Sequence, residues 1–200
     1  YMGINGSQIF PPGKRFGKFP GGSVGWVISR EKFMQEIRAI NYLKLRASYG
    51  ILGNDRVAQY QYLNLFGFGS GYVLGGQDVT SLNPRVAANP NITWEKKRST
   101  DIGIDLGLFN NKLSFTFDYF RSRTTEMLAR RNASIPTYTG LQVPNENIGI
   151  VDNAGFDGQL SYSNRIGELK WTIGGNFTFA KNKIVFYDEV PPAEDYQSMT

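Results

Sequence analysis

The chain has 200 residues, of which 40% are hydrophobic and 14% aromatic, and 23 of them are glycines. It contains no cysteine and no histidine, so disulfides, thiolate metal sites and histidine-based catalysis are excluded, and only carboxylate chemistry is left for an enzyme. The net charge of +5 indicates an acidic partner, such as nucleic acid or an anionic membrane surface.

Six segments alternate polar and apolar residues with a period of two. Since side chains alternate across a strand, each segment is predicted to be a β-strand with one apolar and one polar face. In chain order the predicted strands cover residues 23–29, 43–51, 100–109, 113–120, 154–163 and 169–180. Between the first two, a short helix capped by Ser29 is expected within residues 30–41.

The connections between these strands are of two kinds. Residues 110–111 and 164–168 form tight turns, whereas residues 52–93 and 129–148 are long and rich in Gly, Asn and Pro. Short and long connections therefore fall on opposite edges of one antiparallel meander, as in transmembrane β-barrels. The strands also suit a membrane crossing of about 9–11 tilted residues. The predicted fold is all-β, an antiparallel meander that forms part of a transmembrane barrel.

The alternation by itself also fits a soluble β-sandwich that binds carbohydrate through its loops. A barrel would place Ile102, Leu106 and Phe117 in lipid, whereas a sandwich would bury them against a second sheet. The sorting of short and long connections favours the barrel.

Basic residues gather where strands meet the long connections. They are Lys96, Lys97, Arg98, Arg121 and Arg123, with Arg130, Arg131, Lys181 and Lys183 at the same end. In an outer membrane this end meets anionic lipopolysaccharide, which such cations would bind; the alternative is a solvated rim without a specific ligand. Nucleic acid is the poorest fit, because these cations do not share one helix or sheet face.

The long connection over residues 52–93 carries candidate ligand-binding aromatics. Its glycine-rich part, residues 63–76, lacks the strand–turn–helix context of a nucleotide site. The aromatic residues are Tyr60, Tyr62, Phe66, Phe68 and Tyr72. Their rings could stack on sugar rings of a ligand, or they could pack the loop against its neighbours.

Catalytic and metal sites find no support in the remaining motifs. Asp101, Asp105, Asp118 and Asp157 are predicted on the polar face, where carboxylates are ordinarily solvated. Residues 152–158 lack the ligand spacing of an EF-hand. We therefore expect no enzyme activity and no cofactor.

Five blocks of sequence, in order, resemble the C-terminal barrel of SusC/RagA-type TonB-linked outer-membrane proteins. They are "RFGKFPGGSVGWVIS" (15–29), "YLKLRASYGILGN" (42–54), "NPNITWEKKRSTDIGIDLGLFNNKLSFTFDYFRSRTTEML" (89–128), "NIGIVDNAGFDGQLSY" (147–162) and "WTIGGNFTFAKNKIVFYDE" (171–189). Leu52 departs from the small residue common in the family, and Ala154 and Asp157 replace the commoner Lys and Glu.

The resemblance implies a 22-stranded barrel of the bacterial outer membrane, of which residues 1–200 would be about a quarter. Its N-terminal plug has no counterpart within these residues. The resemblance further implies import of oligosaccharides, or of peptides in some members, together with a SusD-like surface lipoprotein. TonB would supply energy through the plug, and transport would proceed by binding and gated translocation without bond chemistry.

Overall fold

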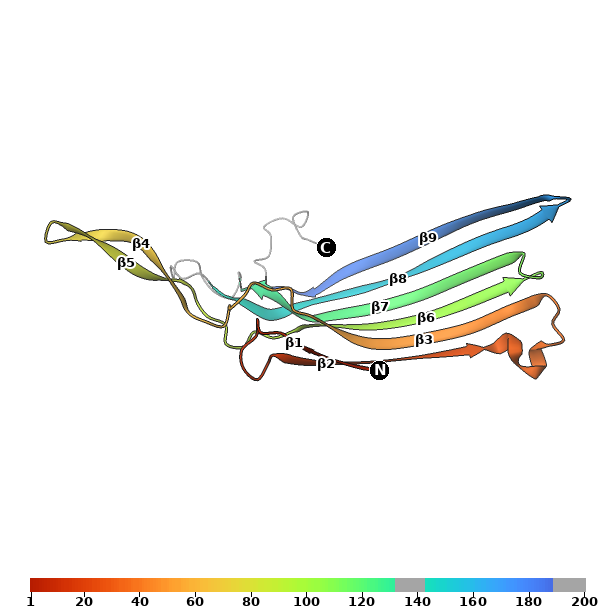
Figure 1. The fold of residues 1–200 in the computed structure, drawn as a ribbon, viewed down its shortest axis with the longest axis horizontal. Coiled ribbons are helices and arrows are strands. Elements are labelled where there is room, and N and C mark those ends of the chain that lie inside the picture. The colour runs from red at the N-terminus through yellow and green to blue at the C-terminus, as the bar shows by residue number, and fades with distance from the viewer. Residues whose placement is uncertain (132–142, 189–200) are drawn as a thin grey trace.

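A computed structural model describes residues 1–131 and 143–188, which form one large antiparallel sheet and one separate hairpin (Figure 1). The seven strands of the large sheet lie in the order β1-β2-β3-β6-β7-β8-β9. Their bounds are β1 (Met2–Gly6), β2 (Phe16–Val27), β3 (Ile40–Asn54), β6 (Glu95–Leu108), β7 (Leu113–Arg130), β8 (Asn145–Ile166) and β9 (Leu169–Phe186). This order confirms the antiparallel meander expected from the sequence.

The short connections meet at one end of this sheet. In the β6–β7 turn, Phe109, Asn110 and Asn111 have φ values of 53°, 59° and 57°. The side-chain oxygen of Asn41 accepts a hydrogen bond from the backbone N–H of Asn110 at 2.5 Å, which secures this turn to the end of β3. Gly167, with φ 61°, makes the β8–β9 turn.

The β2–β3 connection differs from the helix expected there. It contains two 3₁₀ turns, η1 (Ile28–Arg30) and η2 (Lys32–Met34), and Ser29 lies inside the first instead of capping a helix. The extended backbone of Glu31, at φ −74° and ψ 147°, separates the two turns and interrupts any continuous helix. Within the described residues no helix has the length and apolarity to cross a bilayer.

A separate two-stranded hairpin, β4 (Leu65–Leu74) and β5 (Gln77–Val86), projects beyond the opposite end of the sheet (Figure 1). Its turn is made by Gly75 and Gly76, with φ values of 62° and 81°, as two-residue hairpin turns require. The hairpin lies within residues 52–93, which the sequence predicts as one long connection, so β4 and β5 are strands that the prediction missed.

A small core anchors the connections at the hairpin end, which we call the long-loop end. Phe10, Phe19, Ile92 and Trp94 are buried together, with ring centroids 5.1 Å apart for Phe10–Trp94 and 5.3 Å for Phe19–Trp94. The indole N–H of Trp94 donates to the backbone oxygen of Lys14 at 3.1 Å. Apart from these four side chains, Ala129 is the one other buried hydrophobic residue in the described part of the chain. Away from the long-loop end, the described strands of the large sheet therefore bury no hydrophobic side chain.

Candidate functional site

The strand register gives the large sheet two chemically different faces. Paired residues lie on the same face of a sheet, so each register row can be followed across the strands. One row contains Leu45, Ile104, Phe117, Gly158 and Phe177, and the adjacent row on the opposite face contains Arg46, Gly103, Asp118, Asp157 and Thr178. We call these the apolar face and the polar face.

The apolar face carries no charged residue between the short turns and the row that contains Tyr119, Phe156 and Phe179, across strands β3 and β6 to β9. Its rings form a contact network, with centroid distances of 6.0 Å for Phe117–Phe156 and 5.5 Å for Phe156–Phe179. Even so, Ile173 is 69% exposed and Phe179 is 56% exposed. A contiguous exposed apolar surface of this kind marks a site of contact with a membrane or with another protein.

The polar face contains a cluster of one arginine and three aspartates. The guanidinium of Arg46 on β3 lies 3.5 Å from Asp101 and 3.4 Å from Asp105, both on β6, and 2.5 Å from Asp118 on β7. Gly103 leaves the space for this contact, because a Cβ there would collide with the Asp118 carboxylate and the Arg46 guanidinium. The cluster ties three strands together.

The Arg46 cluster has an excess of negative charge. One guanidinium faces three carboxylates, and Asp157 lies beside Asp118 in the same row. Asp118 is 9% exposed, and its Oδ1 has no hydrogen-bond partner in the described part of the chain. The alternation of the sequence predicts the face of these residues, but it does not reveal that one arginine joins them.

The basic residues predicted near the long-loop end divide between the two faces. Lys96, Arg98, Arg121 and Arg123 lie on the apolar face, and Lys97 lies on the polar face. Lys96 pairs with Glu126 at 2.9 Å, and Arg123 pairs with Asp152 at 3.4 Å.

Two further arginines follow at the end of β7. Nε of Arg131 donates to Glu146 at 2.9 Å, and this hydrogen bond raises the pKa of the Arg131 guanidinium. Arg130 lines a cavity of about 240 Å³ at the base of the β4–β5 hairpin, together with Leu65 and Val86. The side-chain amide of Asn145 donates to Gln61 at 3.1 Å beside this cavity. Sequence reasoning missed the cavity, because its walls come from separate connections.

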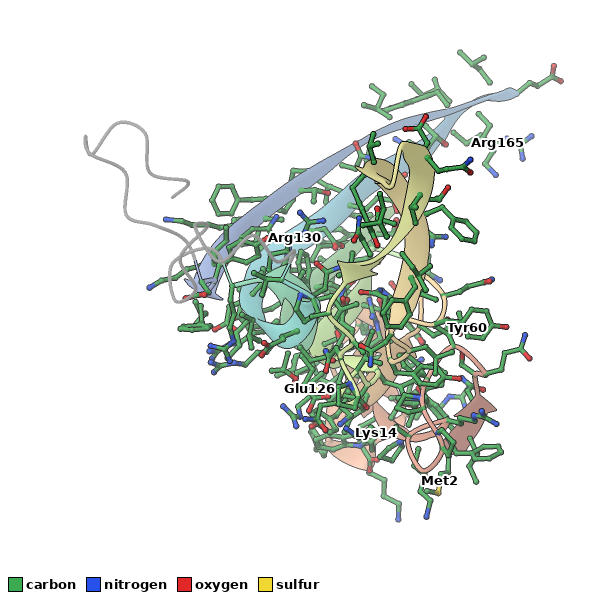
Figure 2. All side chains as sticks on the ribbon, turned by 90° about the vertical axis from the view of Figure 1, so that its left-hand side faces the viewer. Met2, Lys14, Tyr60, Glu126, Arg130 and Arg165 are labelled. Atoms are coloured by element: carbon green, nitrogen blue, oxygen red, sulfur yellow. The ribbon has the colours of Figure 1, made fainter. Side chains whose placement is uncertain are left out.

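The predicted ligand-binding aromatics do not form one cluster. Tyr60 and Tyr62 lie near the hairpin base, with ring centroids 6.4 Å apart, and Tyr62 packs against the small core. Phe66 and Phe68 share one face of the hairpin, and Phe68 is 82% exposed. A register shift between Gly69 and Tyr72 places Tyr72 on the opposite face. Figure 2 views the chain from the long-loop end, where Tyr60 and Glu126 are labelled. Arg165, also labelled, lies on β8 near the β8–β9 turn.

Comparison with known proteins gives one consistent match. A family model described as "TonB dependent receptor-like, beta-barrel" matches residues 11–198. TonB-dependent receptor P3 of Formosa agariphila is 33% identical over 193 residues, which cover 96% of the chain and 19% of that protein. TonB-dependent receptor SusC of Bacteroides thetaiotaomicron is 28% identical, over 92% of the chain and 18% of SusC.

Solved structures agree with this match. The RagAB peptide importer in its "closed-closed" state superimposes with a TM-score of 0.78 and 27% identity, over 92% of the chain and 20% of the RagAB chain. The structure of the RagAB peptide transporter gives a TM-score of 0.76, also at 27% identity, over 90% and 19%. The chain thus spans about a fifth of the length of the relatives it matches.

Proposed function

The chain belongs to the family of TonB-dependent receptor-like β-barrels, and from this premise we propose that the whole protein imports oligosaccharides or peptides across the bacterial outer membrane. Residues 1–200 would then be one segment of its barrel wall. The family is one of transporters and receptors and not of enzymes.

The two-faced sheet is the observation that carries this proposal. On β9 the uncharged part of the apolar face runs from Leu169 to Phe179. At about 3.3 Å per residue and a tilt of 35–45°, this length corresponds to a band about 25 Å high, the height of the lipid-facing band in outer-membrane barrels. A soluble sandwich would cover this face with a second sheet, and the described strands place none there.

The polar face supports a water-filled or plugged lumen. Most of its side chains are hydroxyls, amides and charges, with Phe120 and Ala180 among the apolar exceptions. The Arg46 row lies one residue step on the short-turn side of the row that contains Tyr119, Phe156 and Phe179. We expect the three carboxylates around Arg46 to make this part of the wall negative, which disfavours the passage of anions. The cross-strand ion pairs would also hold the wall in one shape while a substrate passes.

The long-loop end is the side on which we place the external partner. The structural relatives are described as a RagAB peptide importer and a RagAB peptide transporter, and one sequence relative is named SusC. On this basis we propose that a SusD-like surface lipoprotein covers the long-loop end of the barrel. TonB would supply energy through a plug domain of the whole protein, and no cofactor or bond chemistry is needed.

Neighbouring residues on β3 provide a test of the barrel topology. Ala47 lies on the apolar face and Ser48 on the polar face, so A47C and S48C in the full-length protein are matched variants. We expect a lipid-soluble maleimide to label A47C and a charged maleimide to label S48C in intact outer membranes. Labelling of both positions by the charged reagent alone would contradict the proposal.

Uptake tests the import function itself. Cells that lack the gene are compared with cells that express the wild-type protein, using labelled oligosaccharide and labelled peptide mixtures. We expect cells that lack the gene to lose uptake of one of the two substrate classes and the wild-type gene to restore it. The restored uptake should be abolished by a protonophore. Equal uptake of both classes with and without the gene would reject the function.

A further inference from the structure

We propose that the long-loop end of the apolar face binds the phosphate groups of a phosphorylated glycolipid in the outer leaflet of the outer membrane. This inference rests on the proposed function, because it requires the apolar face to contact lipid. It adds a lipid-binding site on the outside of the barrel, separate from the import pathway.

Two register rows of cations follow directly after the aromatic row of the apolar face. The aromatic row contains Tyr119, Phe156 and Phe179. The next row contains Thr100, Arg121, Ala154 and Lys181, and the row after it contains Arg98, Arg123, Asp152 and Lys183. Same-face residues advance about 6.6 Å per step along a strand, so the cations begin where the acyl chains would end.

These rows contain more positive charge than the residues that the structure describes compensate. Arg98 lies directly opposite Arg123, and like charges in this position repel each other. The one carboxylate in the two rows, Asp152, lies 3.4 Å from Arg123 and 3.9 Å from Arg121. Arg98, Lys181 and Lys183 have no ion pair among residues 1–131 and 143–188. An external anion would remove this repulsion.

The position of the cations indicates which anion binds. The cations lie at one end of a face whose other end, down to the short turns, is uncharged. Four adjacent strands, β6 to β9, form this surface, which is therefore about 14 Å wide at about 4.8 Å per strand. Arginines bind phosphate oxygens with paired hydrogen bonds, and the width suits a headgroup larger than a single free phosphate. Acyl chains of the same lipid would lie along the aromatic rows below.

The test compares a triple variant with a matched control in the full-length transporter. R98Q/K181Q/K183Q removes the three cations that lack ion pairs and leaves Arg121, Arg123 and Asp152 in place. K97Q removes a cation at the same height on the polar face. Binding of fluorescent lipopolysaccharide is measured in phosphatidylcholine nanodiscs, with competition by dephosphorylated lipopolysaccharide, inorganic phosphate and phosphatidylglycerol.

We expect the triple variant to bind lipopolysaccharide at least tenfold more weakly than the wild type, and K97Q to bind it like the wild type. Dephosphorylated lipopolysaccharide, inorganic phosphate and phosphatidylglycerol should compete poorly. The proposal is overturned if the triple variant binds like the wild type. It is also overturned if any of the three competitors displaces the fluorescent lipopolysaccharide as well as unlabelled lipopolysaccharide does.

Two controls separate this inference from the proposed function. Heat-modifiable migration in gel electrophoresis reports whether each variant is a folded barrel. If the triple variant does not fold, the single variants R98Q and K183Q replace it. Each of them should then bind lipopolysaccharide more weakly than K97Q does. A wild-type protein that fails to insert into nanodiscs would reject the membrane function. If the wild type and the triple variant both insert and bind lipopolysaccharide equally well, the lipid site is rejected and the proposed membrane function is not.

Discussion

Arg46 on β3 and Asp118 on β7 meet across the one strand between them, with Nη2 of the arginine 2.5 Å from Oδ2 of the aspartate, although they lie 72 positions apart in the chain. The strand between them contributes Gly103, the residue whose missing side chain permits the contact. This pair and its neighbours Asp101 and Asp105 fix the relative positions of β3, β6 and β7 on the polar face.

Replacement of Arg46 by glutamine should destabilise the barrel. The change leaves Asp101, Asp105 and Asp118 close together without their shared cation. Because the arginine side chain is 32% exposed, we expect the free energy of unfolding to fall by about 1–3 kcal/mol, less than for a fully buried pair. Guanidinium unfolding of the folded full-length barrel in detergent measures this. K44Q, on the same face of β3, is the control, and an equal effect of both changes would contradict the prediction.

Gly103→Ala should act through the same contact. The new Cβ would displace the Asp118 carboxylate and the Arg46 guanidinium, so the ion pair would lengthen or break. In a double-mutant cycle with R46Q, we expect an interaction free energy above about 0.5 kcal/mol, because both changes remove one contact. Gly175→Ala is the matched control, since a Cβ there meets no atom within 4 Å. Strict additivity of G103A and R46Q would rule out this coupling.

The alternating pattern was enough to predict the faces of the sheet. Ile104 and Phe117 lie together on the apolar face because a period of two directly determines which side of a strand a residue occupies. The same period does not determine the register, which is the choice of residue that each residue faces on the neighbouring strand. Joining Arg46 to Asp118 requires the pairings of three strands, and these depend on turns and packing along the whole sheet.

Strand ends and the outer hairpin were harder to predict for another reason. β7 continues to Arg130, well beyond residues 113–120, because backbone pairing persists after the side chains have left the apolar band. In β4, three glycines hide the alternation, and β5 contains Pro84 and few apolar residues, although the Gly75–Gly76 pair was a usable hairpin signal. Lys97 was grouped with Arg98 by sequence proximity, but adjacent residues of a strand point to opposite faces.

The apolar face should reject charge much more strongly than the polar face. Phe117→Lys places an ammonium group within the lipid-facing band, and we expect it to lower the free energy of unfolding by about 2–4 kcal/mol. Thr116→Lys, one residue earlier on β7, places the same group on the polar face and should change it by less than about 1 kcal/mol. Unfolding in lipid vesicles measures both. Similar losses for the two variants would show that the faces are not solvated differently.

The β6–β7 turn should tolerate glycine and resist β-branched residues. Asn110 has φ 59°, a conformation in which Val is strained and Gly is not. We expect N110V to cost about 1–2 kcal/mol and N110G to be close to neutral, since the backbone N–H that bonds to Asn41 is kept in both. Thermal unfolding of the full-length barrel distinguishes them. Equal stability of N110V and N110G would show that the turn does not need this conformation.

The hairpin aromatics should affect uptake and not folding. Phe66 and Phe68 expose their rings on one face of β4, whereas Tyr72 lies on the other face. If the Phe66 and Phe68 rings contact substrate, F66A/F68A should lower its affinity about fivefold, which corresponds to about 1 kcal/mol for truncated contact residues. Uptake measured over a range of substrate concentrations should therefore show a raised half-saturation concentration in F66A/F68A and an unchanged one in Y72A. Both proteins should still migrate as folded barrels. An unchanged concentration dependence in F66A/F68A would assign these rings to packing against the lipoprotein or neighbouring loops.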